Sequence, residues 1–164
     1  MSLRNQPMLR ITKEESDNLF TFENNLILHA KIIRNFWNLN THIEMYHNVL
    51  HSVSYTSSAT NTTTVFKNNI LIDPIVDMSS FMGTTENKVN ISSSSPEFLG
   101  HVEKHDPRFY QLLNTSRFIG PVTDRVSYDY FKNTRSTSGP TMGMFEYEPT
   151  CNSDKPLPDA VCIG

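Results

Sequence analysis

Apolar side chains in the first fifty residues recur at steps of three and four, the spacing of one face of a helix. Two stripes share this period and are displaced by two residues, or about 200°, so they lie on opposite sides. Residues 17–50 are therefore predicted to form one long helix that is apolar on two faces. The first stripe comprises Leu19, Phe22, Leu26, Ala30, Ile33 and Trp37, and the second Leu28, Ile32, Phe36, Leu39, Ile43, Tyr46 and Leu50.

Helix signals fade after residue 51. The segment 52–95 is rich in Ser, Thr and Asn, which favour hydrogen bonds to their own backbone over helix formation. Its apolar run at 70–76 contains Pro74, which lacks the N–H that a central strand needs. We expect an extended linker here, with at most an edge strand or a docking segment at 70–76.

Three later positions carry helix start signals. Ser95-Pro96-Glu97 predicts a short helix over 96–104, because Ser is a good N-cap and Pro suits the first helical position. Asp106-Pro107 predicts a second over 107–116, and Asp124 a third over 124–132.

Together these elements predict a mainly α, non-globular chain in which extended segments join the helices. Residues 1–164 would form no independent globular domain. The chain would instead consist of a long-helix region over 12–51, the linker over 52–95, short helices and a docking segment over 96–150, and a Pro-rich tail over 151–164. The alternative is a small α-rich domain with long loops. Because structureless loops beyond about 15 residues are uncommon in compact domains, a chain lying on partners is favoured.

Composition and charge limit the classes of partner and the cell compartments to be expected for this chain. The 164 residues carry a net charge of -3 with dispersed basic residues, which argues against nucleic acid. No apolar stretch approaches the roughly 18 residues of a membrane span, and residues 1–10 lack the apolar core of a signal peptide. A cytosolic or cytoskeletal location is expected, with Cys151 and Cys162 as reduced thiols.

Two histidine pairs have the spacing that binds zinc from one helix face, His47 with His51 and His101 with His105. The metallohydrolase signature requires Glu directly after the first His, where Val102 stands instead. The chain also lacks a Gly-rich phosphate loop and a nucleophile elbow. We therefore expect no enzyme, no cofactor, no metal and no small-molecule substrate, and keep a small metal-binding domain using His101, Glu103 and His105 as the least favoured alternative.

One stretch resembles a known family. Asp106-Pro107-Arg108-Phe109, Leu112-Leu113, Gly120-Pro121, Gly139, Gly143 and Glu148-Pro149 are similar to the second half of the cilia- and flagella-associated protein 144 family, also called family with sequence similarity 183. A looser similarity begins near residue 24, so the resemblance spans roughly residues 24–150. The family's Trp-containing stretch after its first helix is missing, since the single Trp lies inside the predicted helix.

The resemblance implies a structural microtubule inner protein, bound to the lumenal face of axonemal doublet microtubules in a cilium or flagellum. Its partners would be tubulin and neighbouring inner proteins. An accessory strap subunit of another large assembly is the alternative. The residues expected to bind partners are Trp37, Asp106, Arg108, Phe109, Leu113, Gly120, Pro121, Glu148 and Pro149.

Overall fold

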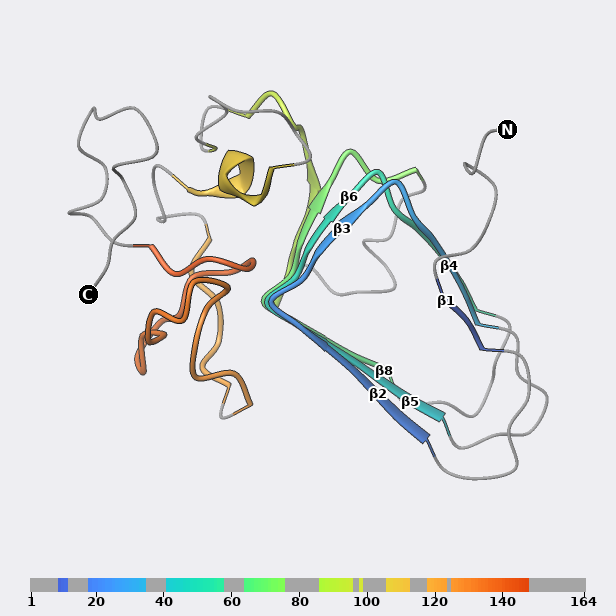
Figure 1. The fold of residues 1–164 in the computed structure, drawn as a ribbon, viewed down its shortest axis with the longest axis horizontal. Helices are drawn as coiled ribbons and strands as arrows, with labels where there is room; N and C mark the ends of the chain where they lie inside the picture. Colours follow the sequence, from blue (N-terminus) through green and yellow to red (C-terminus); the bar gives the residue numbers. More distant parts are fainter. Residues whose placement is uncertain are drawn as a thin grey trace.

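The computed structural model describes residues 9–11, 18–34, 41–57, 64–75, 86–95, 98, 106–112, 118–123 and 125–147. In these residues the chain winds into a parallel β-solenoid, whose strands stack on three sides (Figure 1). The strands are β1 Leu9–Ile11, β2 Asn18–Glu23, β3 Leu26–Leu28, β4 Lys31–Arg34, β5 Thr41–Tyr46, β6 Val49–His51, β7 Ser54–Ser57, β8 Thr64–Lys67, β9 Ile70–Ile72 and β10 Lys88–Ile91.

The strands stack into three sheets, one for each side of the coil. Their orders are β1-β4-β7, β2-β5-β8 and β10-β9-β6-β3, and every pairing between these strands is parallel. Asn18 of β2 pairs with Thr41 of β5, and Val49 of β6 pairs with Ile70 of β9. One coil therefore advances by 23 residues at first and by 21 at the next step.

Tight corners join β2 to β3, β5 to β6 and β8 to β9. At the corner between the β2-β5-β8 sheet and the β3-β6-β9 sheet, Asn24, His47 and Asn68 have φ of 55, 54 and 59°, in the left-handed region. Asn tolerates this region better than most residues. The N–H of each corner residue donates to the next coil, to Tyr46, Lys67 and Glu86 respectively. The same geometry repeats in these three successive coils, so their corners stack in line.

Alternating side chains fill the inside of the solenoid. Phe20 and Phe22 of β2, Ile43 and Met45 of β5, and Phe66 of β8 point inwards, as alternate residues of a strand must on one face. The inner core also contains Ile27, Ala30, Leu50, Val53 and Leu71.

A C-terminal cap covers the outer face of the sheet formed by β3, β6, β9 and β10 (Figure 1). The described part of the cap comprises residues 98, 106–112, 118–123 and 125–147, and includes a 3-10 helix, η2, at Pro107–Tyr110. Because this sheet is covered on both faces, β6 and β9 are buried along their whole length. The second core contains Val49, Ile70, Ile72, Phe98, Phe109, Tyr110, Leu112, Phe118, Met142, Met144 and Phe145.

The predicted long helix over 17–50 is wrong, because this segment contains β2 to β6. Short strands separated by corners place apolar residues three or four apart on average, which imitates a helical stripe. The supposed first stripe in fact mixes inward residues such as Phe22 with residues such as Leu26 that pack under the cap. The segment 52–95 also contains strands, β7 to β10, where extended linking chain was expected.

The three short helices are wrong as well. Phe98, within 96–104, forms an isolated antiparallel bridge with Leu112, and the other residues of that range lie outside the described residues. The Asp106-Pro107 start signal is used, but by one 3-10 turn that ends at Tyr110. In 124–132, the described residues 125–132 belong to a hairpin in which Tyr128 pairs with Thr134.

Candidate functional site

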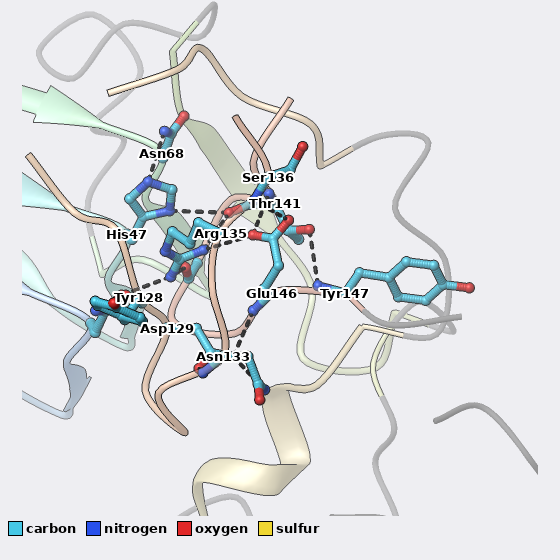
Figure 2. A network of polar contacts seen from close by, with 12 residues as sticks. His47, Asn68, Tyr128, Asp129, Asn133, Arg135, Ser136, Thr141, Glu146 and Tyr147 are labelled. Atoms are coloured by element: carbon cyan, nitrogen blue, oxygen red, sulfur yellow. Dashed lines mark hydrogen bonds and ion pairs between the residues drawn. The ribbon is translucent and has the colours of Figure 1, made fainter. Parts of the chain in front are cut away.

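A group of polar side chains, most of them buried, lies where the cap meets the first corner of the solenoid. We call it the corner–cap network; it comprises Asn24 and six residues that Figure 2 labels: His47, Asn68, Asp129, Arg135, Thr141 and Glu146. The first three residues come from successive coils, so the stacking of the corners places them in a row. The other four come from the cap.

His47 and Asn68 form a chain of hydrogen bonds with cap carbonyls. The Asn68 amide donates to the Pro121 carbonyl at 2.8 Å and lies 3.0 Å from His47 Nε2. His47 Nε2 must therefore accept, and Nδ1 carries the proton that is donated to the Thr141 carbonyl at 3.1 Å. This arrangement requires a neutral imidazole.

The charge state of His47 agrees with that geometry. Burial, and to a smaller extent the nearby Arg135 guanidinium, lower its pKa from 6.5 to about 3, although bonds to backbone carbonyls partly oppose the shift. His47 is fully buried. Its ring therefore joins the cap to the solenoid as a neutral group at physiological pH.

Acidification is expected to destabilise the fold through His47. Between its unfolded pKa of 6.5 and its folded pKa of about 3, the unfolded state binds more protons, so stability falls as pH falls. From pH 7 to 5.5 the loss should be about 1 kcal/mol. Urea unfolding at both pH values checks this, with His47→Gln as control, because Gln donates and accepts without titrating. Equal pH dependence in the two proteins would contradict a neutral buried His47.

Arg135 is the centre of the network on the cap side. Its guanidinium donates to the carbonyls of Thr141 at 3.0 Å and Gly143 at 2.9 Å, and to Asn24 Oδ1 at 2.7 Å. It also pairs with Glu146 at 3.2 Å, and both side chains are buried. Burial lowers the pKa of Arg135 to about 10, with Glu146 and Asp129 opposing the shift, so the side chain stays charged at neutral pH.

Asp129 holds the hairpin of the cap. Its buried carboxylate accepts from the Asn133 N–H at 2.8 Å, the Asn133 amide at 3.2 Å and the Glu146 N–H at 3.0 Å. Lys132, in the turn, has a φ of 71°. Three aromatic residues of this hairpin face solvent and form what we call the aromatic tip: Tyr128, Tyr130 and Phe131, exposed by 54%, 45% and 36%.

A second junction joins the cap to the solenoid through His51. The Tyr110 hydroxyl lies 2.6 Å from His51 Nδ1, and the Asp73 carboxylate lies 3.5 Å from His51 Nε2. Burial raises the pKa of Tyr110, and the Asp73 charge raises it further, so the phenol stays protonated. With the Tyr110 ring fully buried, this Asp-His-Tyr row fixes η2 on the solenoid.

Several residues predicted from the sequence to bind partners lie inside the cap. The side chains of Asp106 and Arg108 pair with each other, and Asp106 also accepts from the Arg108 N–H at the start of η2. Phe109 is buried and stacks on Phe98, with ring centroids 6.5 Å apart.

Gly120 and Pro121 lie at the corner–cap network. A Cβ on Gly120 would come within 1.8 Å of Asn68 Oδ1, so only glycine allows this approach. Other predicted site residues lie outside the described residues: Trp37, Leu113, Glu148, Pro149, His101, Glu103, His105, Cys151 and Cys162.

Sequence reasoning missed Arg135, Asp129 and the corner asparagines. For the corners a signal exists: an apolar strand that ends in an Asn-containing corner recurs at Asn25, Asn48 and Asn69, and Asn87 occupies the same corner position in the next coil. Repeats of 20–50 residues are the signature of a solenoid. No comparable signal marks Arg135 or Asp129, because their partners are backbone groups and side chains of irregular segments that follow no repeated spacing.

The described residues contain no group of three or more His, Cys, Asp or Glu side chains that could hold a metal ion. Nor do they form a helix long and apolar enough to cross a membrane. No family model, curated protein or solved structure matches the chain.

Proposed function

We propose that this chain is a non-catalytic structural module, which holds a partner protein through the aromatic tip and thereby takes its place in a larger assembly. The observation that carries this proposal is the exposure of Tyr128, Tyr130 and Phe131 on a hairpin that is fixed from below. Tyrosine is enriched in protein interfaces and in the few residues that dominate binding energy.

The tip is rigid, which favours binding. The Tyr130 N–H donates to the Met144 carbonyl at 2.8 Å, and the Asn24 amide donates to the Tyr128 carbonyl at 2.7 Å. The Phe131 ring stacks on the buried Phe145 ring at 4.9 Å. A side chain that is already ordered loses little conformational entropy on binding.

The polar network below the tip supports a structural role too. His47 donates to the Thr141 carbonyl and Arg135 donates to Asn24, and these two bonds join the cap to the solenoid. Arg135 and Glu146 also bond to each other and to backbone groups within the cap. The network therefore holds in place the hairpin that carries the aromatic tip.

The proposal predicts that removing the aromatic rings releases the protein from its assembly. In native extracts of cells that express it, the 18.8 kDa wild-type chain should sediment with a much larger particle. The variant Tyr128→Ser with Tyr130→Ser should sediment as the free chain. The control Ile75→Ser removes another exposed apolar side chain, 63% exposed, and should sediment like wild type. A wild-type protein that sediments alone, or a double variant that stays in the particle, would contradict the proposal.

A narrower proposal names the assembly as the axonemal doublet microtubule, with tubulin and other inner proteins as partners. It is supported by the resemblance of residues 106–149 to the ciliary family and no longer by a long helix. Axonemes washed in high salt test it, because lumenal proteins resist extraction. Release of the chain together with outer surface proteins would exclude the lumen.

A further inference from the structure

Lys132 occupies the last position of the turn that carries the aromatic tip. Its N–H donates to the Asp129 carbonyl at 3.1 Å, and the Asp129 N–H donates to the Asn133 carbonyl at 2.9 Å, which closes the hairpin loop. The last residue of such a loop adopts a left-handed conformation, for which glycine is the usual choice. Lys132 has a φ of 71° at this position. The chain therefore places a long cationic side chain where the backbone favours glycine.

This residue type is also unusual among the left-handed positions of the chain. In the described part of the chain, the other non-glycine residues with a positive φ are Asn, His, Ser or Asp. Asn and Asp tolerate this conformation because their short side chains form local hydrogen bonds, which Lys cannot do in the same way. Residues held in such conformations cluster at sites that bind or react. The strained backbone at Lys132 therefore points to a role for its ammonium group outside the fold.

The acidic side chains of the cap hairpin face inwards and leave that ammonium group unpaired. Asp129 is 1% exposed and accepts from backbone N–H groups, and Glu146 pairs with the buried Arg135 (Figure 2). Lys132 is exposed, and it forms no ion pair with a carboxylate of the described residues. The tip thus presents a positive charge, although the whole chain carries a net charge of -3.

The other exposed cation of the described cap belongs to a different surface. Arg125 pairs with Glu44 at 3.1 Å and with Glu23 at 3.7 Å, both on the solenoid. Its charge is therefore used within the chain, at the base of the cap. The charge that is left for a partner at the aromatic tip is that of Lys132.

We propose that the partner held by the aromatic tip is an acidic protein surface, which presents a carboxylate to Lys132 beside an apolar pocket for Tyr130 and Phe131. This inference rests on the proposed function, because it names the chemistry of the partner at the same surface. The two rings lie 5.4 Å apart and directly precede Lys132 in the chain, so rings and ammonium group meet a partner together. Complementary charge fixes the orientation of two proteins and disfavours wrong partners.

Substitutions at Lys132 separate its charge from its backbone conformation. In the native extracts used for the aromatic tip, Lys132→Glu should lower the particle-bound fraction by at least about tenfold, because it places like charges together. Lys132→Arg should sediment like wild type. Lys132→Gly should lower the bound fraction without lowering the thermal unfolding midpoint, because glycine adopts the left-handed conformation freely. The matched control is Lys31→Glu, which changes an exposed lysine of β4 and should sediment like wild type.

Carbodiimide cross-linking tests the carboxylate directly. The reagent joins an amine to a carboxylate as an amide, with net loss of water, when the two groups are in contact. In the wild-type particle, mass spectrometry should find Lys132 joined to an Asp or Glu of another protein. Lys132→Arg lacks this amine, so it should lose that product while it still sediments with the particle.

Several results would overturn the proposal. These are undiminished binding by Lys132→Glu, an equal loss in Lys31→Glu, and a wild-type particle without a Lys132 cross-link to another protein. A cross-link to a second copy of the chain, or release of the wild type by nuclease, would assign the surface to self-association or to nucleic acid instead. If Lys132→Glu stays bound while Tyr128→Ser with Tyr130→Ser is released, only the acidic partner is wrong. If the double variant stays bound too, the proposed function itself fails.

Discussion

Replacing Arg135 with alanine is expected to lower the free energy of unfolding by about 3–5 kcal/mol, the usual cost of breaking a buried ion pair from one side. The substitution leaves the Glu146 carboxylate buried without its cation, and removes the donor from the carbonyls of Thr141 and Gly143. Because small domains are stable by about 5–15 kcal/mol, this is a large share of the total. Equilibrium urea unfolding followed by circular dichroism measures the loss.

Two further arginine substitutions are controls for Arg135→Ala. Arg125 also pairs with carboxylates, Glu44 at 3.1 Å and Glu23 at 3.7 Å, but its side chain is 47% exposed. Arg125→Ala should cost at most about 1 kcal/mol, as exposed ion pairs do. Arg135→Lys keeps the charge without the planar fork and should fall between the two. Similar losses for Arg125→Ala and Arg135→Ala would contradict the buried network.

Asn25, Asn48, Asn69 and Asn87 form a ladder of hydrogen bonds along the stacked corners. Asn69→Ala within this ladder should lower the free energy of unfolding by about 3–5 kcal/mol, because unsatisfied buried groups cost roughly 1–3 kcal/mol each. The Asn69 side chain makes four hydrogen bonds, two with Asn48 and one each with Met45 O and Asn87. Alanine leaves the Asn48 N–H and Met45 O buried without that partner. The urea unfolding midpoint measures the effect.

The same substitution at the end of the ladder is the matched control. Asn25→Ala loses only the bonds that its amide donates to Glu23 O and Asn48 Oδ1, in a partly exposed coil. It should cost about 1 kcal/mol, the net value of an ordinary hydrogen bond. If Asn69→Ala were as mild as Asn25→Ala, the stacked corners would not be a main source of stability.

Local signals were easier to recognise in this sequence than the fold. Asp106-Pro107 starts η2. The expectation that Pro74 leaves at most an edge strand at 70–76 was wrong, because β9 ends at Ile72, before the proline, and lies between β6 and β10. The alternation of Phe20 and Phe22 was present as well. This alternation was hard to recognise because a corner follows two residues after Phe22 and changes which positions point inwards. Over a longer stretch the apolar positions therefore match the spacing of a helical stripe.

The corner–cap network could not have been predicted from local patterns. Arg135 bonds to Asn24, 111 residues earlier in the chain, and His47 bonds to Thr141, 94 residues later. Such contacts depend on where the cap folds back, which no short-range period specifies. The near-repeat of Asn-containing corners could be recognised in the sequence, and it predicts stacked strands instead of a long helix.

The most direct test of the solenoid is the distance between Leu19 and His42. These residues pair directly across β2 and β5, so their backbones lie about 4.8 Å apart, whereas one helix over 17–50 would separate them by about 35 Å. With both native cysteines replaced by serine, Leu19→Cys and His42→Cys would be labelled with pyrene maleimide. The solenoid predicts strong excimer emission that disappears on unfolding in urea, and monomer emission alone from the folded protein would contradict it.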